Sequence, residues 1–171
     1  MEAAVRLYSR AMTTRLQRWQ RNRLPLILWL MATCLYVGRG YMLTVNLTDS
    51  LPGHVFLIEK GRTPVLGELA AFRWEGSWPY PRGSIFVKIL RGGPGSRVEV
   101  SERNFYLDGQ FVGTAKERAR SGEFLEKGPS GVLPPGHYYV AADHPDSLDS
   151  RYRLTGWIRP DQIIGRARRL W

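Results

Sequence analysis

From residue 41 onward, the apolar residues of the chain come in short runs that glycine, proline and polar residues separate. Short alternating or continuous apolar runs of this kind predict β-strands. The predicted strands are Tyr41–Leu47, Val55–Ile58, Gly67–Phe72, Ser84–Leu90, Arg97–Val100, Phe105–Leu107, Gln110–Val112, Tyr138–Ala142 and Ile163–Ala167. Asp108-Gly109, between two of these runs, is typical of a type I′ hairpin turn. The pattern predicts a mainly β fold, an antiparallel barrel or sheet domain, in which residues 114–131 form a loop or a ragged helix.

An uncharged and mostly apolar run, residues 24–38, precedes these strands. A cleaved signal peptide, a buried helix of a soluble domain and a transmembrane anchor are the three interpretations. We favour the anchor, because Tyr36-Val37-Gly38-Arg39-Gly40 is a poor cleavage site and Arg39 can reach the membrane surface. Six arginines precede the run, namely Arg6, Arg10, Arg15, Arg18, Arg21 and Arg23. The positive-inside rule then predicts a basic cytoplasmic tail (1–23), an anchor (24–40) and a domain on the far side of the membrane (41–171).

The chain carries a formal net charge of +10, with 25 Lys and Arg against 15 Asp and Glu. The arginines gather near the two ends of the chain. The sequence has no basic helix with the spacing that contacts bases in DNA, no zinc finger and no aromatic motif typical of nucleic-acid-binding proteins. Cys34 is the single cysteine, and the three histidines lack the spacing of metal ligands. We therefore expect no internal disulfide, no metal site and no cofactor, and we expect a lipid bilayer rather than nucleic acid as a partner.

Two polar residues are unusual in their surroundings. Ser50 lies on a turn directly after the first predicted strand, and Lys88 lies inside the apolar run Ile85–Leu90. Because an unpaired buried ammonium is costly, burial would shift Lys88 toward its neutral form, which is a base. A neutral amine beside a serine hydroxyl makes a nucleophile, so the pair predicts a Ser/Lys hydrolase. Taken singly, Ser50 also fits an ordinary turn hydroxyl and Lys88 a strand-end lysine with its ammonium in water.

Four blocks in this order resemble the type I signal peptidases, peptidase family S26, and most closely their conjugative-transfer, TraF-type branch. They are the nucleophile box Thr48–Gly53, the Gly-acid-apolar strand Gly67–Phe72, the lysine box Val87–Gly95, and a C-terminal box with Pro135–Val140, Asp143, Ser147–Tyr152 and Ile164–Ala167. The resemblance covers nearly all of the chain from residue 24 on. The sequence departs from the family in three places. Ala141-Ala142-Asp143-His144 stands where Gly-Asp-Asn is usual, and Arg153-Leu154-Thr155 lengthens the spacing between Tyr152 and Gly156. Arg91 is an unusual residue for the lysine box.

The resemblance implies a catalytic role for four side chains. Ser50 would attack the scissile carbonyl, and Lys88 would take its proton and later protonate the leaving amine. The backbone N–H of Ser50 and the hydroxyl of Thr48 would form the oxyanion hole. Ser147 would orient the Lys88 amine through a hydrogen bond.

Asp149 has two interpretations under this resemblance. It is either the acid of a Ser-Lys-Asp triad or a partner of Arg151 that braces the loop. We favour the bracing role, because a carboxylate in contact with Lys88 would raise the pKa of the lysine and oppose its action as a base. Asp143 receives the same structural interpretation.

The resemblance also implies the substrate, a membrane-embedded pre-protein and specifically the pilin precursor of a conjugative type IV secretion system. The protein would then sit in the bacterial inner membrane with its catalytic domain in the periplasm. An extended peptide would add to a strand edge next to Ser50, with small side chains in shallow pockets lined by Leu51, Pro52, Val55 and Ile85. Some members of the branch join the new terminus to give a cyclic pilin.

Two other classes of protein stay open. One is a catalytically silent membrane-anchored assembly or binding module, and the other is a basic DNA-transfer accessory protein.

Overall fold

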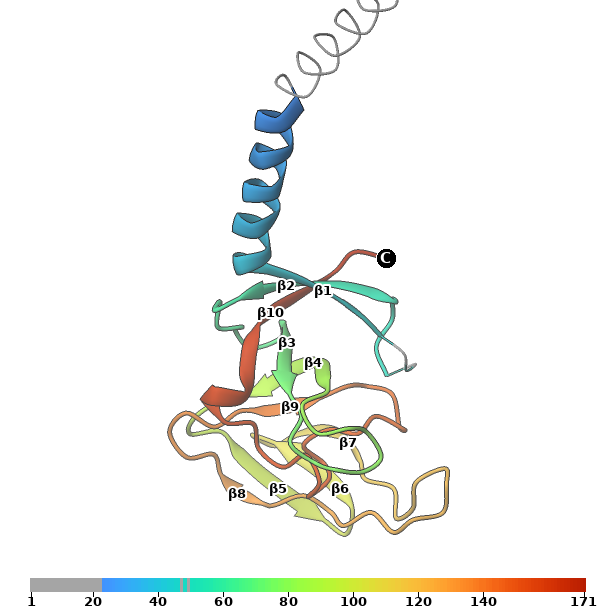
Figure 1. Ribbon diagram of the computed structural model, residues 1–171. Helices are drawn as coiled ribbons and strands as arrows, with labels where there is room; N and C mark the ends of the chain where they lie inside the picture. The colour runs from blue at the N-terminus through green and yellow to red at the C-terminus, as the bar shows by residue number, and fades with distance from the viewer. Residues whose placement is uncertain (1–22, 47, 49) are drawn as a thin grey trace, which may run out of the picture. The chain divides into compact units, whose positions relative to one another are not determined.

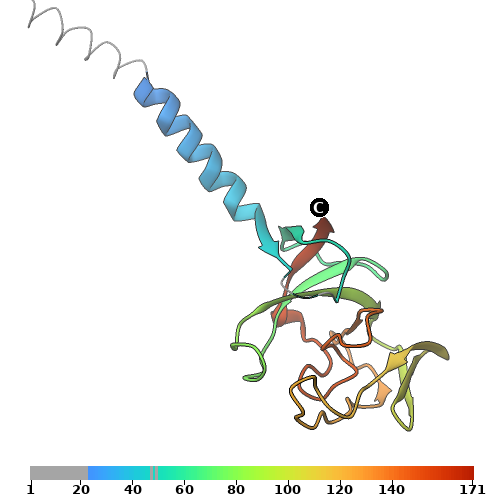
Figure 2. The ribbon, with the colours of Figure 1, turned by 90° about the vertical axis from the view of Figure 1, so that its right-hand side faces the viewer.

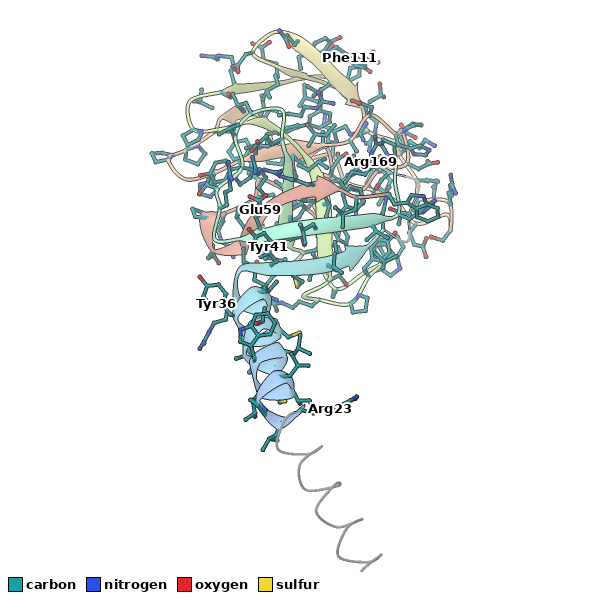
Figure 3. The ribbon with its side chains drawn as sticks, turned by 90° about the horizontal axis from the view of Figure 1, so that it is seen from above. Arg23, Tyr36, Tyr41, Glu59, Phe111 and Arg169 are labelled. Atoms are coloured by element: carbon teal, nitrogen blue, oxygen red, sulfur yellow. The ribbon has the colours of Figure 1, made fainter. Side chains whose placement is uncertain are left out.

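The structure is a computed structural model that describes residues 23–46, 48 and 50–171, so most of the predicted tail lies outside the described residues. The chain divides into two compact units, Met1–Gly40 and Tyr41–Trp171. In the first unit, residues 23–40 form a helix from which side chains such as Arg23 and Tyr36 project (Figure 3). Among the described residues, no helix combines the length and the apolar character that crossing a bilayer requires.

Six strands of the second unit form one antiparallel sheet (Figure 1). They are β1 (Tyr41–Val45), β2 (Val55–Lys60), β3 (Leu69–Arg73), β4 (Ile85–Gly92), β9 (Tyr139–Ala141) and β10 (Ile163–Arg169). Their order in the sheet is β1-β2-β10-β3-β4-β9, so the last strand of the chain lies between two early ones. Most of the predicted strands of this unit are therefore present, and the fold is mainly β and antiparallel, as the sequence predicts.

The remaining four strands form a second antiparallel sheet. They are β5 (Arg97–Ser101), β6 (Asn104–Leu107), β7 (Gln110–Thr114) and β8 (Gly131–Val132), in the order β7-β6-β5-β8. Asp108 and Gly109 join β6 to β7 with φ angles of 49° and 80°, the left-handed values that a type I′ turn needs. The second sheet lies at the end of the domain away from β1 (Figure 2), and Phe111 on β7 lies far from Tyr41 on β1 in Figure 3.

The segment between β7 and β8 is a loop rather than a ragged helix. It contains turns and an isolated bridge between Arg118 and Phe124. Backbone hydrogen bonds hold it, among them one from Leu125 N–H to the carbonyl of Glu117 at 2.7 Å. Close to the C-terminus, a short 3-10 helix, Pro160–Gln162, leads into β10.

Apolar side chains from both sheets form the largest core cluster of the domain. Val98 and Phe105 from the second sheet belong to it together with Tyr139 of β9, and all three are almost completely buried. A separate cluster contains Phe72 of β3 and Leu90 of β4. Since burial of apolar surface is the main stabilising term in folding, the first cluster is what joins the two sheets into one domain.

Besides the outer edge of β9, which ends the strand order, two strand edges of the six-stranded sheet have no partner strand among the described residues. The first is the N-terminal half of β4, because Ile85–Ile89 pairs with β3 on one side while β9 pairs with β4 only from Ile89 onward. The second is β1, which pairs with β2 alone. An unpaired edge offers a row of backbone N–H and C=O groups to any chain that approaches it.

Candidate active site

The turn between β1 and β2 carries Ser50, and the side chain of Asn46 holds this turn in shape. The Asn46 amide donates to the carbonyl oxygens of Leu51 (3.2 Å) and Gly53 (3.4 Å). Its Oδ1 accepts hydrogen bonds from the N–H (3.2 Å) and the hydroxyl (3.1 Å) of Thr48. Asn46 received no role from the sequence, although an Asn at the start of a turn is a recognised signal for such local bonds. The result is a fixed position for the Ser50 hydroxyl.

Lys88 on β4 reaches this hydroxyl from a strand 38 residues later in the chain. Its Nζ lies 2.8 Å from Ser50 Oγ, and the two side chains are only 5% and 9% exposed, respectively. The ring of Phe86, two residues earlier on the same face of β4, has its centroid 5.8 Å from Nζ. The two residues that the sequence singles out are therefore in direct contact, and both side chains are buried.

Burial lowers the pKa of Lys88 from its ordinary 10.5 to about 8, because the charged ammonium loses its hydration. The negative charge of Asp149 raises this pKa and the positive charge of Arg151 lowers it again, and both effects are smaller than that of burial. Roughly a tenth of the Lys88 side chains are then neutral at pH 7. In the neutral state the amine nitrogen can accept the Ser50 O–H proton across the same 2.8 Å contact.

Thr48 brings a second hydroxyl to the site. Its Oγ1 lies 2.9 Å from Ser50 Oγ, and either oxygen can be the donor of this hydrogen bond. A hydroxyl beside the nucleophile is the kind of donor that an oxyanion hole uses.

Asp149 and Arg151 form a buried ion pair behind the Ser–Lys contact. Both Asp149 oxygens accept hydrogen bonds, Oδ1 from Arg151 Nε (2.8 Å) and backbone N–H (3.2 Å), and Oδ2 from Arg151 Nη2 (2.8 Å) and Ala142 N–H (3.1 Å). Among the described residues, no hydrogen bond joins Asp149 to Lys88. With four donors already bound, the carboxylate has the surroundings of a structural brace, and its effect on Lys88 is that of a nearby charge.

Ser147 and Asp143, the other two supporting residues, lie in different surroundings. Ser147 is 1% exposed and its side chain lines the same cavity as Lys88. Within the described part of the chain its Oγ has no hydrogen-bond partner, so the predicted bond to Lys88 is not made. Asp143 is largely exposed and forms an ion pair with Arg91, outside the cavity.

A cavity of about 730 Å³ opens beside the Ser50–Lys88 pair. The free edges of β1 and β4 contribute to its lining, through residues 44–46 at the end of β1 and residues 84–88 at the start of β4 and just before it. The predicted pocket residue Ile85 lines the cavity, and Trp78 and Tyr152 add aromatic surface to it.

The other three predicted pocket residues lie elsewhere. Leu51 is 7% exposed and packs in an apolar cluster with Phe56 and Ala142, so it supports the turn from inside. On β2, Phe56 lines the cavity, and the neighbouring Val55 therefore points to the opposite face of the strand. Pro52 is exposed and does not line the cavity either. Which face a strand residue takes depends on sheet pairing, which the sequence did not reveal.

Comparison with known proteins identifies the family. The family model described as "Signal peptidase, peptidase S26" matches residues 16–171. The chain belongs to this signal peptidase family. A curated relative, the conjugal transfer protein TraF of Agrobacterium fabrum, is 32% identical over 156 residues, which cover 80% of this chain and 85% of the relative. The family resemblance and its TraF-type branch, expected from four sequence blocks, are thus confirmed.

A solved structure that is similar to this chain is that of a signal peptidase I from Enterococcus faecalis. It aligns with a TM-score of 0.42 and 23% sequence identity, covering 61% of this chain and 97% of that chain.

Proposed function

We propose that this signal-peptidase family member is a serine endopeptidase in which Ser50 is the nucleophile and Lys88 the general base. The observation that carries the proposal is the 2.8 Å contact between Lys88 Nζ and Ser50 Oγ, made by a lysine whose burial lowers its pKa to about 8. A base needs a pKa near the operating pH, and a serine hydroxyl needs such a base in hydrogen-bond reach.

In the acylation step, neutral Lys88 takes the hydroxyl proton while Ser50 Oγ forms a bond to the scissile carbonyl carbon. The carbonyl oxygen becomes an oxyanion, which the Thr48 hydroxyl and the backbone N–H of Ser50 stabilise, at roughly 3–4 kcal/mol for each donor. The C–N bond then breaks, and the Lys88 ammonium gives its proton to the leaving amine. An ester between Ser50 and the acyl part of the substrate remains, and Lys88 is neutral again.

In the second step a water molecule attacks this ester. Lys88 takes a proton from the water, the Ser50–acyl bond breaks, and Ser50 recovers its proton from Lys88. If an amine of the substrate attacks in place of water, the same sequence closes a new peptide bond and gives a cyclic product. Ser147 is proposed to orient the Lys88 amine, since its buried Oγ lines the cavity and has a free hydrogen-bonding capacity among the described residues.

The acyl part of the substrate is proposed to bind as an extended strand between the free edges of β1 and β4. Both edges line the cavity next to Ser50, so an inserted peptide can pair its backbone with residues 44–46 and 84–88. Ile85, Phe86 and Val87 make this part of the cavity apolar. Shallow apolar surfaces next to a pairing edge favour small side chains in the peptide, of an Ala-x-Ala type.

The proposed substrate is a membrane-embedded pre-protein, the pilin precursor of a conjugative type IV secretion system. The support is the relative named as a conjugal transfer protein and the family's description as a signal peptidase. The chain is proposed to be anchored in the bacterial inner membrane by residues 24–40, with residues 41–171 in the periplasm. The uncharged run and the six arginines before it support this orientation.

Processing of the co-encoded pilin precursor in membranes tests the proposal. Wild type, Ser50→Ala and Lys88→Ala are compared by mass spectrometry, with Lys127→Ala as the matched control, because Lys127 is exposed and its Nζ donates to the carbonyl of Glu102, away from the cavity. We expect cleavage by wild type and Lys127→Ala and none by the other two. The product mass separates a linear from a cyclic pilin. Normal cleavage by Lys88→Ala contradicts the assignment of the base, and an inactive wild type favours a catalytically silent assembly module.

A further inference from the structure

A second part of the cavity wall carries positive charge. Lys116, Arg118 and Arg120, from the loop between β7 and β8, line the same cavity as Ser50 and Lys88. We call these three residues the basic wall. They belong to neither strand edge, so they line a part of the cavity that the proposed acyl segment does not use.

One cation of the basic wall, Arg118, has no carboxylate partner among the described residues. Asp146 accepts hydrogen bonds from Arg120 Nη2 (2.7 Å) and Nε (3.1 Å) and also pairs with Lys116. These bonds lower the pKa of Asp146 to about 2, so its single negative charge is constant at neutral pH. Arg118 donates to the carbonyl of Gly122 at 2.9 Å and pairs with no carboxylate among the described residues. Glu117 lies on the same loop but does not line the cavity.

Two arginines elsewhere in the domain each pair with two carboxylates. Arg166, on β10, donates to two carboxylates, those of Glu59 (2.9 Å) and Glu68 (2.8 Å). Arg159 likewise pairs with both Glu75 and Asp161. A cavity-lining arginine without a carboxylate partner among the described residues, as Arg118 is, is thus a local property of the cavity wall and not only a reflection of the +10 charge of the whole chain.

A peptide that is cleaved at Ser50 must continue beyond the scissile bond. Its acyl segment occupies the strand edges in the proposed function, so the leaving segment extends into the remainder of the cavity, where the basic wall lies. An extended chain advances about 3.3 Å per residue, so only the first few leaving residues can contact the wall. Guanidinium and ammonium groups bind carboxylates through charge-assisted hydrogen bonds.

We infer that the basic wall binds a carboxylate in the leaving segment of the substrate, and so selects cleavage sites followed by negative charge. The carboxylate comes either from an Asp or Glu side chain within the first few leaving residues or from the end of a short leaving chain. This inference rests on the proposed function, because it takes Ser50 as the point of cleavage.

The test uses the full chain in detergent and four synthetic peptides with one shared Ala-x-Ala acyl segment. Their four-residue leaving segments contain either Glu or Gln and end in either a free acid or an amide, which separates the two sources of the carboxylate. Binding is measured by fluorescence anisotropy on the Ser50→Ala background, and cleavage by mass spectrometry on wild type. We expect at least one carboxylate-bearing peptide to bind roughly tenfold tighter than the neutral peptide at low salt, with a smaller preference at high salt.

An Arg118→Gln and Arg120→Gln double variant should reduce this preference to within about twofold, while binding of the neutral peptide is unchanged. Arg153→Gln is the matched control, because Arg153 is exposed, pairs with Glu126 and lies outside the cavity. Equal affinities for all four peptides overturn the inference, and so does a preference that survives in the double variant. If the double variant instead loses only its binding to vesicles with anionic phospholipid, the wall faces a membrane and the inference is overturned.

Failure of this inference can be distinguished from failure of the proposed function. Cleavage of the neutral peptide by wild type, without any carboxylate preference, contradicts only the inference that the basic wall binds a carboxylate. A carboxylate preference in binding, with no cleavage of any peptide by wild type, supports the wall as a binding site and contradicts the peptidase chemistry.

Discussion

Lys88 lowers the stability of the folded domain, because its ammonium is buried where the folded state favours the neutral amine. The folded-state pKa of about 8 lies below the ordinary 10.5 of an unfolded lysine. The unfolded chain therefore binds this proton more tightly, and stability rises with pH between these two values. Below about pH 8 the full destabilisation is present, and it amounts to at most about 3 kcal/mol.

Replacement of Lys88 by an apolar residue of similar length should accordingly stabilise the fold while it abolishes activity. For Lys88→Met we expect the free energy of unfolding to rise by about 1–3 kcal/mol at pH 7, and the difference from wild type to vanish near pH 11. Urea denaturation at the two pH values measures this, with Lys127→Met as the control at an exposed lysine. A difference that is the same at both pH values would show that Lys88 titrates normally.

Asp149 offers the sharpest contrast to Ser50, since both lie near Lys88 but Asp149 is the counter-ion of the buried Arg151. Asp149→Asn leaves Arg151, which is 1% exposed, without its counter-ion, and we expect a loss of about 3–5 kcal/mol in stability. Ser50→Ala removes one hydroxyl and should lower the thermal midpoint far less. Because the Asp149 charge raises the pKa of Lys88, any folded Asp149→Asn protein should reach half-maximal activity at a lower pH. Equal thermal midpoints for the two variants contradict the bracing role.

Among the strands, β2 and β10 approach each other closely at Gly165. A Cβ added at Gly165 on β10 would lie 1.9 Å from the carbonyl oxygen of Glu59 on β2, so the two strands would have to separate. We expect Gly165→Ala to destabilise the domain by roughly 1–3 kcal/mol in urea denaturation. Gly93→Ala is the control, because a Cβ at Gly93 meets nothing within 4 Å. A Gly165→Ala protein as stable as Gly93→Ala would contradict the close approach of these strands.

Local strand structure could be predicted from the sequence, and sheet pairing could not. Asp108-Gly109 fixes the β6–β7 hairpin through two left-handed residues, which is a property of the turn itself. The insertion of β10 between β2 and β3 depends on contacts between residues about a hundred positions apart, and no local pattern encodes it. The same limit explains the pocket. Ile85 lines the cavity, whereas Val55 does not, because the face of the sheet that Val55 occupies depends on the register of β2.

The second sheet supports the loop behind the Ser50–Lys88 pair. A Cβ at Gly113 on β7, where φ is 132°, would lie 2.4 Å from Arg151 Nη1, so the strand backbone packs directly on the buried guanidinium. The N–H of Lys116 donates to the hydroxyl of Tyr152 at 3.0 Å. Both sheets thus hold the segment that carries Asp149 and Arg151.

For the whole molecule, the sequence suggests the Ser50–Lys88 pair more clearly than it suggests the packing around that pair. Ser50 and Lys88 were recognisable because a lysine in an apolar run and a serine on a turn are chemically unusual, and the order of four blocks added the family. The packing of the second sheet on Arg151, and the place of the basic wall in the cavity, follow from tertiary contacts that have no signature in the sequence.

The rate at which a serine-reactive fluorophosphonate acylates Ser50 in the full chain, followed by intact-mass spectrometry from about pH 6 to about pH 10, tests the Ser50–Lys88 assignment most directly. We predict a rate that rises with pH and is half-maximal near pH 8, where Lys88 becomes neutral. Lys88→Met should be slower by roughly a hundredfold or more, and Ser50→Ala should not react. A rate that does not change with pH over this range, or a Lys88→Met protein that reacts as fast as wild type, would contradict the assignment.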